Sequence, residues 1–126
     1  MKITPLLMVE SIEESLPFWA GRIGFEKTAE VPDGDRLGFV ILARDGAEIM
    51  LQTIESVRKD EPKFVPSGSA NGASLFIEVG NFEDVLKRLA GYPVAMGDRT
   101  TFYGMREIGV RDPDGHIVVF AARTSA

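Results

Sequence analysis

The sequence has 126 residues, of which 44% are hydrophobic and 26% charged, an average globular composition that suffices for one hydrophobic core. The absence of cysteine excludes a disulfide framework, a thiolate nucleophile and a sulfur-ligated metal site, and it suits a reducing cytoplasm, where we expect the protein to reside. A net charge of -5 without a basic cluster argues against a nucleic-acid partner, and the N-terminal apolar run is too short for a signal peptide or a membrane span.

The first half of the chain is predicted to fold as a strand, a helix and three more strands. Residues 3–9 form a short apolar strand, and Ser11 with Glu14 is a capping box for a helix over residues 12–22. Pro17 removes a backbone hydrogen bond inside that helix, so it either bends the helix or marks a later start. Strands follow at residues 25–31, 37–44 and 47–52, and Asp45-Gly46 predicts a tight hairpin between the last two.

The second half repeats this order after a connector. Residues 54–72 contain several prolines and glycines and are predicted to join the halves. Asn81 and Asp84 then open a helix over residues 82–90. The predicted strands of this half are residues 73–79, 93–96, 105–111 and 116–121, with a turn at 112–115.

The two halves also repeat each other in sequence. Residues 7–14 are echoed by residues 77–84, and residues 20–21 by residues 90–91, in both cases 70 positions later. Two copies are too few for a solenoid, so the repeat predicts one α+β domain over residues 1–126, built from similar halves at about 1–53 and 73–123.

Side-chain alternation along the predicted strands separates two faces of the sheet. One face is uniformly apolar and is expected to lie under the helices: Leu7, Val9, Ile49, Leu51, Leu75, Ile77, Val79, Val118 and Phe120. The other face mixes polar with apolar groups: Thr4, Leu6, Met8, Glu48, Met50, Gln52, Ser74, Phe76, Glu78, Ile117, Val119 and Ala121. This mixture fits a curved sheet around a ligand cavity, and it also fits the solvated rim of a second small core.

Two phrases of the sequence resemble the vicinal oxygen chelate superfamily. Val9, residues 11–19 and the following Ile23-Gly24-Phe25-Glu26 are similar to its opening, and residues 103–107 with 110–116 are similar to its closing phrase in glyoxalase and bleomycin-resistance-like members. The match covers essentially the whole chain. The resemblance implies two paired βαβββ modules that form a cup-shaped mixed sheet with helices on its outer face.

Enzymes of that superfamily hold a divalent metal with four side chains, usually His, Glu or Gln. Carried onto this sequence, the four positions are Thr4, Met50, Ser74 and Val119, and none of these side chains is a suitable ligand. The resemblance is therefore closest to the bleomycin-resistance-like members that lack the metal, and no cofactor is expected. The single histidine, His116, lies in a predicted turn and is interpreted as structural, which also disfavours a catalytic triad.

The leading hypothesis is a non-catalytic protein that sequesters a small molecule, antibiotic-like or aromatic and cationic, in the cavity of the cupped sheet. The expected ligand-binding residues are Phe39, Glu48, Met50, Gln52, Ser74, Phe76, Glu78, Tyr103, Glu107 and Val119. One alternative is a glyoxalase or dioxygenase-type enzyme, with an unrecognised metal-ligand set or with Glu48, Glu78 or Glu107 as a general base. Another is a structural dimer whose cavity is vestigial.

A homodimer is also expected. An open cupped sheet leaves strand edges uncovered, and covering by a second copy is the usual arrangement in the resembling family. Phe64, Phe102 and Tyr103 lie in predicted loops, so they are expected either at that interface or at the mouth of the cavity, although each could instead cap the core of its own subunit.

Overall fold

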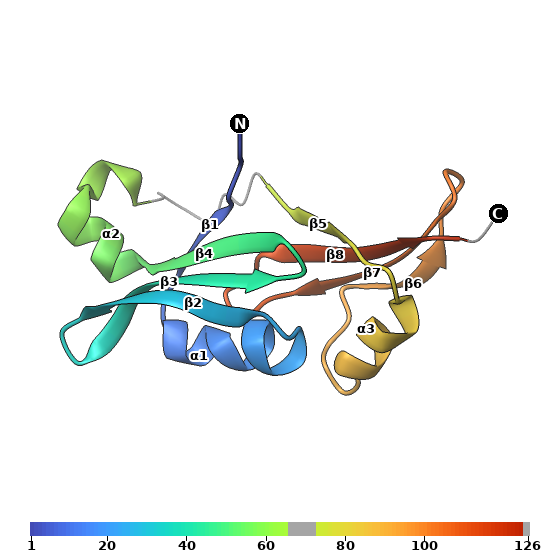
Figure 1. Cartoon of the computed structure of the whole chain (residues 1–126), viewed down its shortest axis with the longest axis horizontal. Coiled ribbons are helices and arrows are strands. Elements are labelled where there is room, and N and C mark those ends of the chain that lie inside the picture. Colours follow the sequence, from blue (N-terminus) through green and yellow to red (C-terminus); the bar gives the residue numbers. More distant parts are fainter. Residues whose placement is uncertain (66–72, 125–126) are drawn as a thin grey trace. The chain divides into compact units, whose positions relative to one another are not determined.

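The computed structural model describes residues 1–65 and 73–124. The chain divides into two compact units, Met1–Ala70 and Asn71–Ala126. Over the described residues, each unit holds one four-stranded sheet, and each follows the same strand, helix and three-strand order, so the α+β class and the paired βαβββ modules are confirmed (Figure 1). No helix in these residues combines the length and the apolar character that crossing a membrane requires.

Unit 1 contains a sheet with the strand order β1-β4-β3-β2, in which β1 and β4 are parallel and the other pairs antiparallel. Asp45 and Gly46 both have positive φ, 52° and 82°, as expected for the tight hairpin that joins two of these strands. The elements are β1 (Leu6–Val9), α1 (Ile12–Leu16), a π-helix (Pro17–Arg22), β2 (Glu26–Asp33), β3 (Arg36–Arg44), β4 (Ala47–Thr53), α2 (Ile54–Asp60) and a 3₁₀ turn (Pro62–Phe64).

The helix of unit 1 changes type at its proline. The Ser11 hydroxyl accepts a hydrogen bond from the Glu14 amide at 3.2 Å, which confirms the predicted capping box. From Pro17 onward the helix has the wider π geometry, because proline supplies no amide donor for the α pattern. The wider turn packs Phe18 and Trp19 edge to face at 5.0 Å between ring centroids, and both side chains are buried in the core.

Unit 2 repeats the arrangement with the strand order β5-β8-β7-β6, in which β5 and β8 are parallel. Asn81 caps the helix by accepting the Asp84 amide at 3.1 Å, again as predicted. The elements are β5 (Leu75–Glu78), α3 (Phe82–Arg88), β6 (Met96–Thr100), β7 (Met105–Arg111) and β8 (Ile117–Arg123).

Two predicted segments differ from the structure. The predicted strand at 93–96 is wrong, because β6 runs over Met96–Thr100, where four exposed residues give no apolar alternation that the sequence could reveal. The predicted connector begins with α2 and the 3₁₀ turn. Thr53 caps α2 by accepting the Ser56 amide at 3.1 Å. The rest of the connector, residues 66–72, lies outside the described residues.

The apolar face is the buried one in both units. In unit 1, Val9 and Leu51 are fully buried and Ile49 nearly so, and in unit 2 Val118 and Phe120 are buried. Leu7, Leu75, Ile77 and Val79 of this face are half-buried. The other face holds mostly half-buried and exposed side chains, although Ala121 and its strand neighbour Glu107 are buried. Burial of one stripe per strand therefore sets the register and leaves the mixed face available to other molecules.

Candidate functional site

The mixed face of unit 2 consists of an apolar row next to a polar row. Strand pairing places Phe76 beside Val119, and Val119 beside Gly109 on β7. One step along the strands, pairing through Ala121 places Glu78 and Glu107 in one row, and Arg99 on β6 continues it beyond Glu107. Phe76 is 55% exposed, which is unusual for a large aromatic residue on a strand.

Glu107 is the buried centre of the polar row. Its side chain is only 2% exposed, yet both carboxyl oxygens have partners. The Tyr103 hydroxyl donates to Oε2 at 2.5 Å, and the Arg99 guanidinium donates to Oε1 through Nη2 at 3.2 Å. The hydrogen bond to Glu107 raises the pKa of Tyr103, so the phenol stays protonated and keeps its donor.

The three side chains form one cluster with a buried acid and two exposed donor groups. Tyr103 is 51% exposed and the Arg99 side chain 56% exposed, while Glu107 lies beneath them. We name Arg99, Tyr103 and Glu107 the polar cluster of unit 2. Because Glu107 accepts hydrogen bonds from both partners, it holds Tyr103 and Arg99 in place.

The remaining predicted residues of unit 2 lie at the margin of this face. Glu78 is exposed on the edge strand β5, 3.8 Å from the Arg123 guanidinium. Ser74 precedes β5 and is exposed. Phe102, fully exposed in the loop between β6 and β7, packs edge to face against Tyr103 at 5.1 Å between centroids.

The mixed face of unit 1 brings together the predicted residues of β3 and β4. Phe39 pairs with Gln52, and Met50 lies between Leu6 on β1 and Ile41 on β3. Most of these side chains are half-buried, so they cover the strands and still present apolar surface. Thioether, aliphatic and aromatic groups of this kind adapt to the shape of an apolar ligand.

The polar residues of this face already have partners within unit 1. The Glu48 carboxyl forms an ion pair with the Lys2 ammonium at 2.8 Å, and the Gln52 amide donates a hydrogen bond to the Ser56 hydroxyl at 3.1 Å. The pairing of Glu48 with Lys2 is largely exposed, since the lysine side chain is 72% accessible, so a ligand cation could displace it at little cost.

The four positions that hold the metal in enzymes of the resembling superfamily have no suitable donors here. Met50 and Val119 lie on the mixed faces, while Thr4 and Ser74 precede the first strand of each unit. A thioether, an alkyl group and two neutral hydroxyls do not fit a hard or borderline divalent ion. Within residues 1–65 and 73–124, no group of three His, Cys, Asp or Glu side chains could hold a metal ion.

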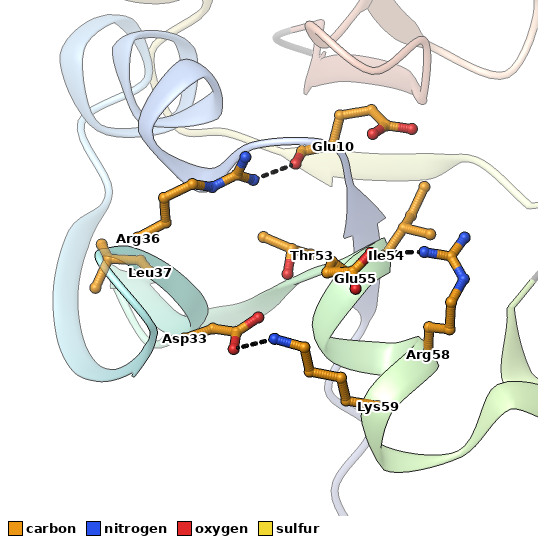
Figure 2. Close-up of a pocket in the computed structure, with 9 residues that line it drawn as sticks. All are labelled: Glu10, Asp33, Arg36, Leu37, Thr53, Ile54, Glu55, Arg58 and Lys59. Carbon is orange, nitrogen blue, oxygen red and sulfur yellow. Dashed lines mark hydrogen bonds and ion pairs between the residues drawn. The ribbon is translucent and has the colours of Figure 1, made fainter.

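A second feature of unit 1 is a crevice of about 320 Å³ at the end of its sheet (Figure 2). Its lining combines three basic side chains, three acidic residues and a few apolar groups, drawn from the β2–β3 turn, the ends of β1 and β4, and α2. We name this the terminal crevice, and it is lined by Glu10, Asp33, Arg36, Leu37, Thr53, Ile54, Glu55, Arg58 and Lys59.

The charged groups of the terminal crevice are held in defined positions. Lys59 donates to Asp33 at 2.8 Å, and this hydrogen bond raises the pKa of the lysine ammonium. Arg58 donates to Glu55 at 2.8 Å. Figure 2 shows that Arg36 instead points to the backbone of Glu10, whose carbonyl accepts from its Nη2 at 2.9 Å.

Sequence reasoning did not identify Arg99 or the residues of the terminal crevice. Arg99 lies on β6, which the sequence prediction placed at residues 93–96. The pairing of Arg99 with Glu107 could therefore not be inferred from the sequence. The crevice residues come from separate segments, and the parallel pairing of β1 with β4 together with the antiparallel pairing of β4 with β3 brings them to one end of the sheet. The basic pair of α2 was a usable signal, since Arg58 and Lys59 lie early in the predicted connector.

Comparison with known families gives one match over nearly the whole chain. The profile described as Glyoxalase/Bleomycin resistance protein/Dioxygenase superfamily matches residues 3–120. No curated protein matches the sequence.

Several solved structures share the fold. A glyoxalase/bleomycin resistance protein/dioxygenase family enzyme from Burkholderia phytofirmans PsJN has a TM-score of 0.77 at 16% identity, over 94% of this chain and 94% of that one. TioX from Micromonospora sp. ML1 has a TM-score of 0.73 at 17% identity, over 97% of this chain and 99% of that one. TnmS3, an antibiotic binding protein from Streptomyces sp. CB03234, has a TM-score of 0.66 at 22% identity, over 98% of both chains.

Proposed function

Because this chain belongs to the Glyoxalase/Bleomycin resistance protein/Dioxygenase superfamily, we propose that it binds a small molecule and acts by sequestering it, without catalysing a reaction. The ligand we propose is flat and largely apolar, antibiotic-like or aromatic, with polar or cationic groups at its edge. Sequestration requires only affinity and sufficient protein, so it is compatible with a site that lacks reactive groups.

The observation that carries this proposal is the mixed face of unit 2, which presents exposed Phe76 on one strand and the polar cluster on the same face. A flat ring system stacked on Phe76 would lie beside Val119, and the polar cluster would be roughly 10 Å away across two strands. Tyr103 and Arg99 would donate to acceptors on the ligand, with Glu107 holding both in place.

Glu78 and Glu48 would meet donor or cationic groups of the ligand, since both are only partly covered. Met50, Phe39 and Gln52 would supply the second contact surface from unit 1, and Ser74 and Val119 complete the proposed set. The cup-shaped sheet that would place both faces around one ligand stays a prediction from the sequence.

The relative described as an antibiotic binding protein supports a binding role in this fold. The donor chemistry points the same way, because the positions that carry the metal in enzymes of the family are Thr4, Met50, Ser74 and Val119 here. We further propose that the protein is a cytoplasmic homodimer, with exposed Phe102 and Phe64 near the interface or at the mouth of the site.

Titration with 8-anilinonaphthalene-1-sulfonate tests the proposed surface, since this aromatic anion offers a naphthalene ring to Phe76 and a sulfonate to the donors of the polar cluster, and it reports binding by fluorescence. We expect saturable binding to the wild type and a dissociation constant raised about tenfold in Phe76→Ala, because stacking contributes about 1 kcal/mol beyond apolar burial. Bleomycin, the drug named in the family description, is added as a competitor.

Val94→Ala is the matched control, because Val94 is 50% exposed in the same unit but lies outside the face. It should leave the titration unchanged while the melting temperatures of both variants stay close to that of the wild type. Absence of saturable binding, or equal loss in the two variants, would contradict the proposal.

A further inference from the structure

We propose that the terminal crevice of unit 1 is a separate binding site for a small oxyanion, a carboxylate or a phosphate, with Arg36 as its principal ligand-binding residue. The site goes beyond the proposed function, because none of the residues proposed to bind the sequestered molecule lines the crevice.

The topology of unit 1 opens this crevice. Val9 and Thr53 are the last pair of the parallel strands β1 and β4, and the chain leaves the sheet after both of them. One strand continues into α1 and the other into α2, so their connections diverge at Glu10 and Ile54. Crevices beyond the carboxyl ends of parallel strands, where successive connections diverge, are the usual ligand sites of open sheets.

Arg36 supplies a guanidinium that a backbone carbonyl orients; the Glu13 carboxylate, which accepts the Leu37 amide at 2.8 Å, interacts with it electrostatically but forms no ion pair with it. The Nη2 of Arg36 donates to the Glu10 carbonyl, a neutral acceptor, at 2.9 Å. Among the residues that the structure describes, no carboxylate lies within ion-pair distance of its guanidinium. The fork of the guanidinium therefore keeps several donors for an oxyanion, and bidentate geometry suits carboxylate and phosphate alike.

Lys59 and Arg58 contribute further N–H donors, each ion-paired at 2.8 Å to a carboxylate of the crevice. These pairs cancel in formal charge, which leaves Arg36 as the cation of the crevice without an ion-pair partner among the described residues. Figure 2 shows the carboxyl group of Glu10 directed away from Arg36, so the charge that faces the crevice beside the Glu10 backbone is that of Arg36. An oxyanion would therefore bind chiefly through the guanidinium donors of Arg36 that the Glu10 carbonyl does not use.

The dimensions and the walls limit the ligand to a small molecule. A volume of about 320 Å³ corresponds to about ten water molecules at roughly 30 Å³ each. Leu37 and Ile54 contribute apolar wall next to the charged groups. An organic carboxylate would use both kinds of surface, whereas inorganic phosphate would use only the charged groups.

The test is an NMR titration of the whole chain with benzoate, with inorganic phosphate and with chloride at equal ionic strength. We expect saturable shifts of the Arg36, Leu37 and Glu55 amides with at least one oxyanion, and no saturation with chloride, which only screens charge. Saturation by benzoate alone assigns an organic carboxylate, and saturation by phosphate assigns the inorganic ion or a phosphate ester.

Arg36→Gln should weaken this binding at least tenfold, because it removes a charge-assisted hydrogen-bonding partner. Lys59→Gln, a change at a side chain that is 61% exposed, should weaken it severalfold and serves as the second variant if Arg36→Gln does not fold. Lys87→Gln removes the same charge from an exposed site in unit 2 and should have no effect.

Responses to both oxyanions that match the response to chloride would overturn the proposal. So would undiminished binding in Arg36→Gln, or an equal loss in Lys87→Gln. Phe76→Ala separates this site from the sequestration surface, because it should leave oxyanion binding unchanged whether or not the proposed sequestration function holds.

Discussion

At the scale of single residues, Glu107 is a buried carboxyl group on a sheet face. Its side chain is 2% exposed, and burying a carboxylate costs desolvation free energy that its partners must offset. Its two partners, Tyr103 and Arg99, direct their exposed surfaces outward. A buried acid that holds two exposed donors is typical of a binding surface, which is why the polar cluster is central to the proposed function.

His116 provides the clearest pH-dependent contact. Its Nδ1 lies 2.9 Å from Oδ2 of Asp112, whose side chain is fully buried, and this hydrogen bond raises the pKa of the imidazole above its usual 6.5. A group whose pKa is raised in the folded state stabilises the fold when it is protonated. This stabilisation is complete below the unfolded pKa and is lost as pH rises through the folded pKa. The contribution is therefore present below about pH 6.5 and is lost as pH rises through the raised folded pKa.

We expect urea denaturation to show that the stability difference between the wild type and His116→Gln shrinks as pH rises from 5.5 to 8.5. Because the chain has one histidine, its imidazole resonances give the folded pKa directly. Asp112→Asn should return that pKa toward about 6.5. A wild-type pKa at or below that value would contradict this account of the turn.

At the scale of elements, the close contact of β3 with the end of β2 and the first turn of α2 requires a glycine, Gly38, on β3. A Cβ added at Gly38 would lie 2.8 Å from the Cβ of Asp33 and 3.4 Å from the Cβ of Ser56. The glycine thus allows the β2–β3 turn and the first turn of α2 to approach the strand closely. The same approach brings Asp33 and α2 to opposite sides of the terminal crevice.

Gly38→Ala should therefore lower the free energy of unfolding by about 1 to 3 kcal/mol, the usual cost of overpacking a close contact. Denaturation with urea measures this change. Gly80→Ala is the control, because no atom lies within 4 Å of the added Cβ and its effect should stay within about 0.5 kcal/mol. Equal effects of the two substitutions would show that the contact at Gly38 is not tight.

At the scale of the whole molecule, the exposed aromatic residues favour self-association. Phe102 is fully exposed and Phe64 is 68% exposed, and large apolar groups on loops often lie in protein interfaces. Light scattering at micromolar concentration should give about twice the 13.8 kDa mass of one chain. A mass that stays at that of one chain on concentration would rule the homodimer out.

The α+β class, the paired modules and the superfamily could be recognised from the sequence because they depend on local signals. The capping residues Ser11 and Asn81, the Asp45-Gly46 hairpin and the alternation of Ile49 and Leu51 act within a few residues, and the structure confirms each. The predicted cavity and its ligand-binding residues stay predictions.

Only the tertiary structure decided which separated residues meet. Arg99 lies opposite Glu107 because β6 pairs with β7 in a register that its polar, exposed sequence did not reveal. Arg36 faces Glu10 because the parallel pairing of β1 and β4 brings two chain exits to one end of the sheet. Contacts of this kind depend on strand order and register, which arise from burial of the whole apolar face rather than from neighbours in the chain.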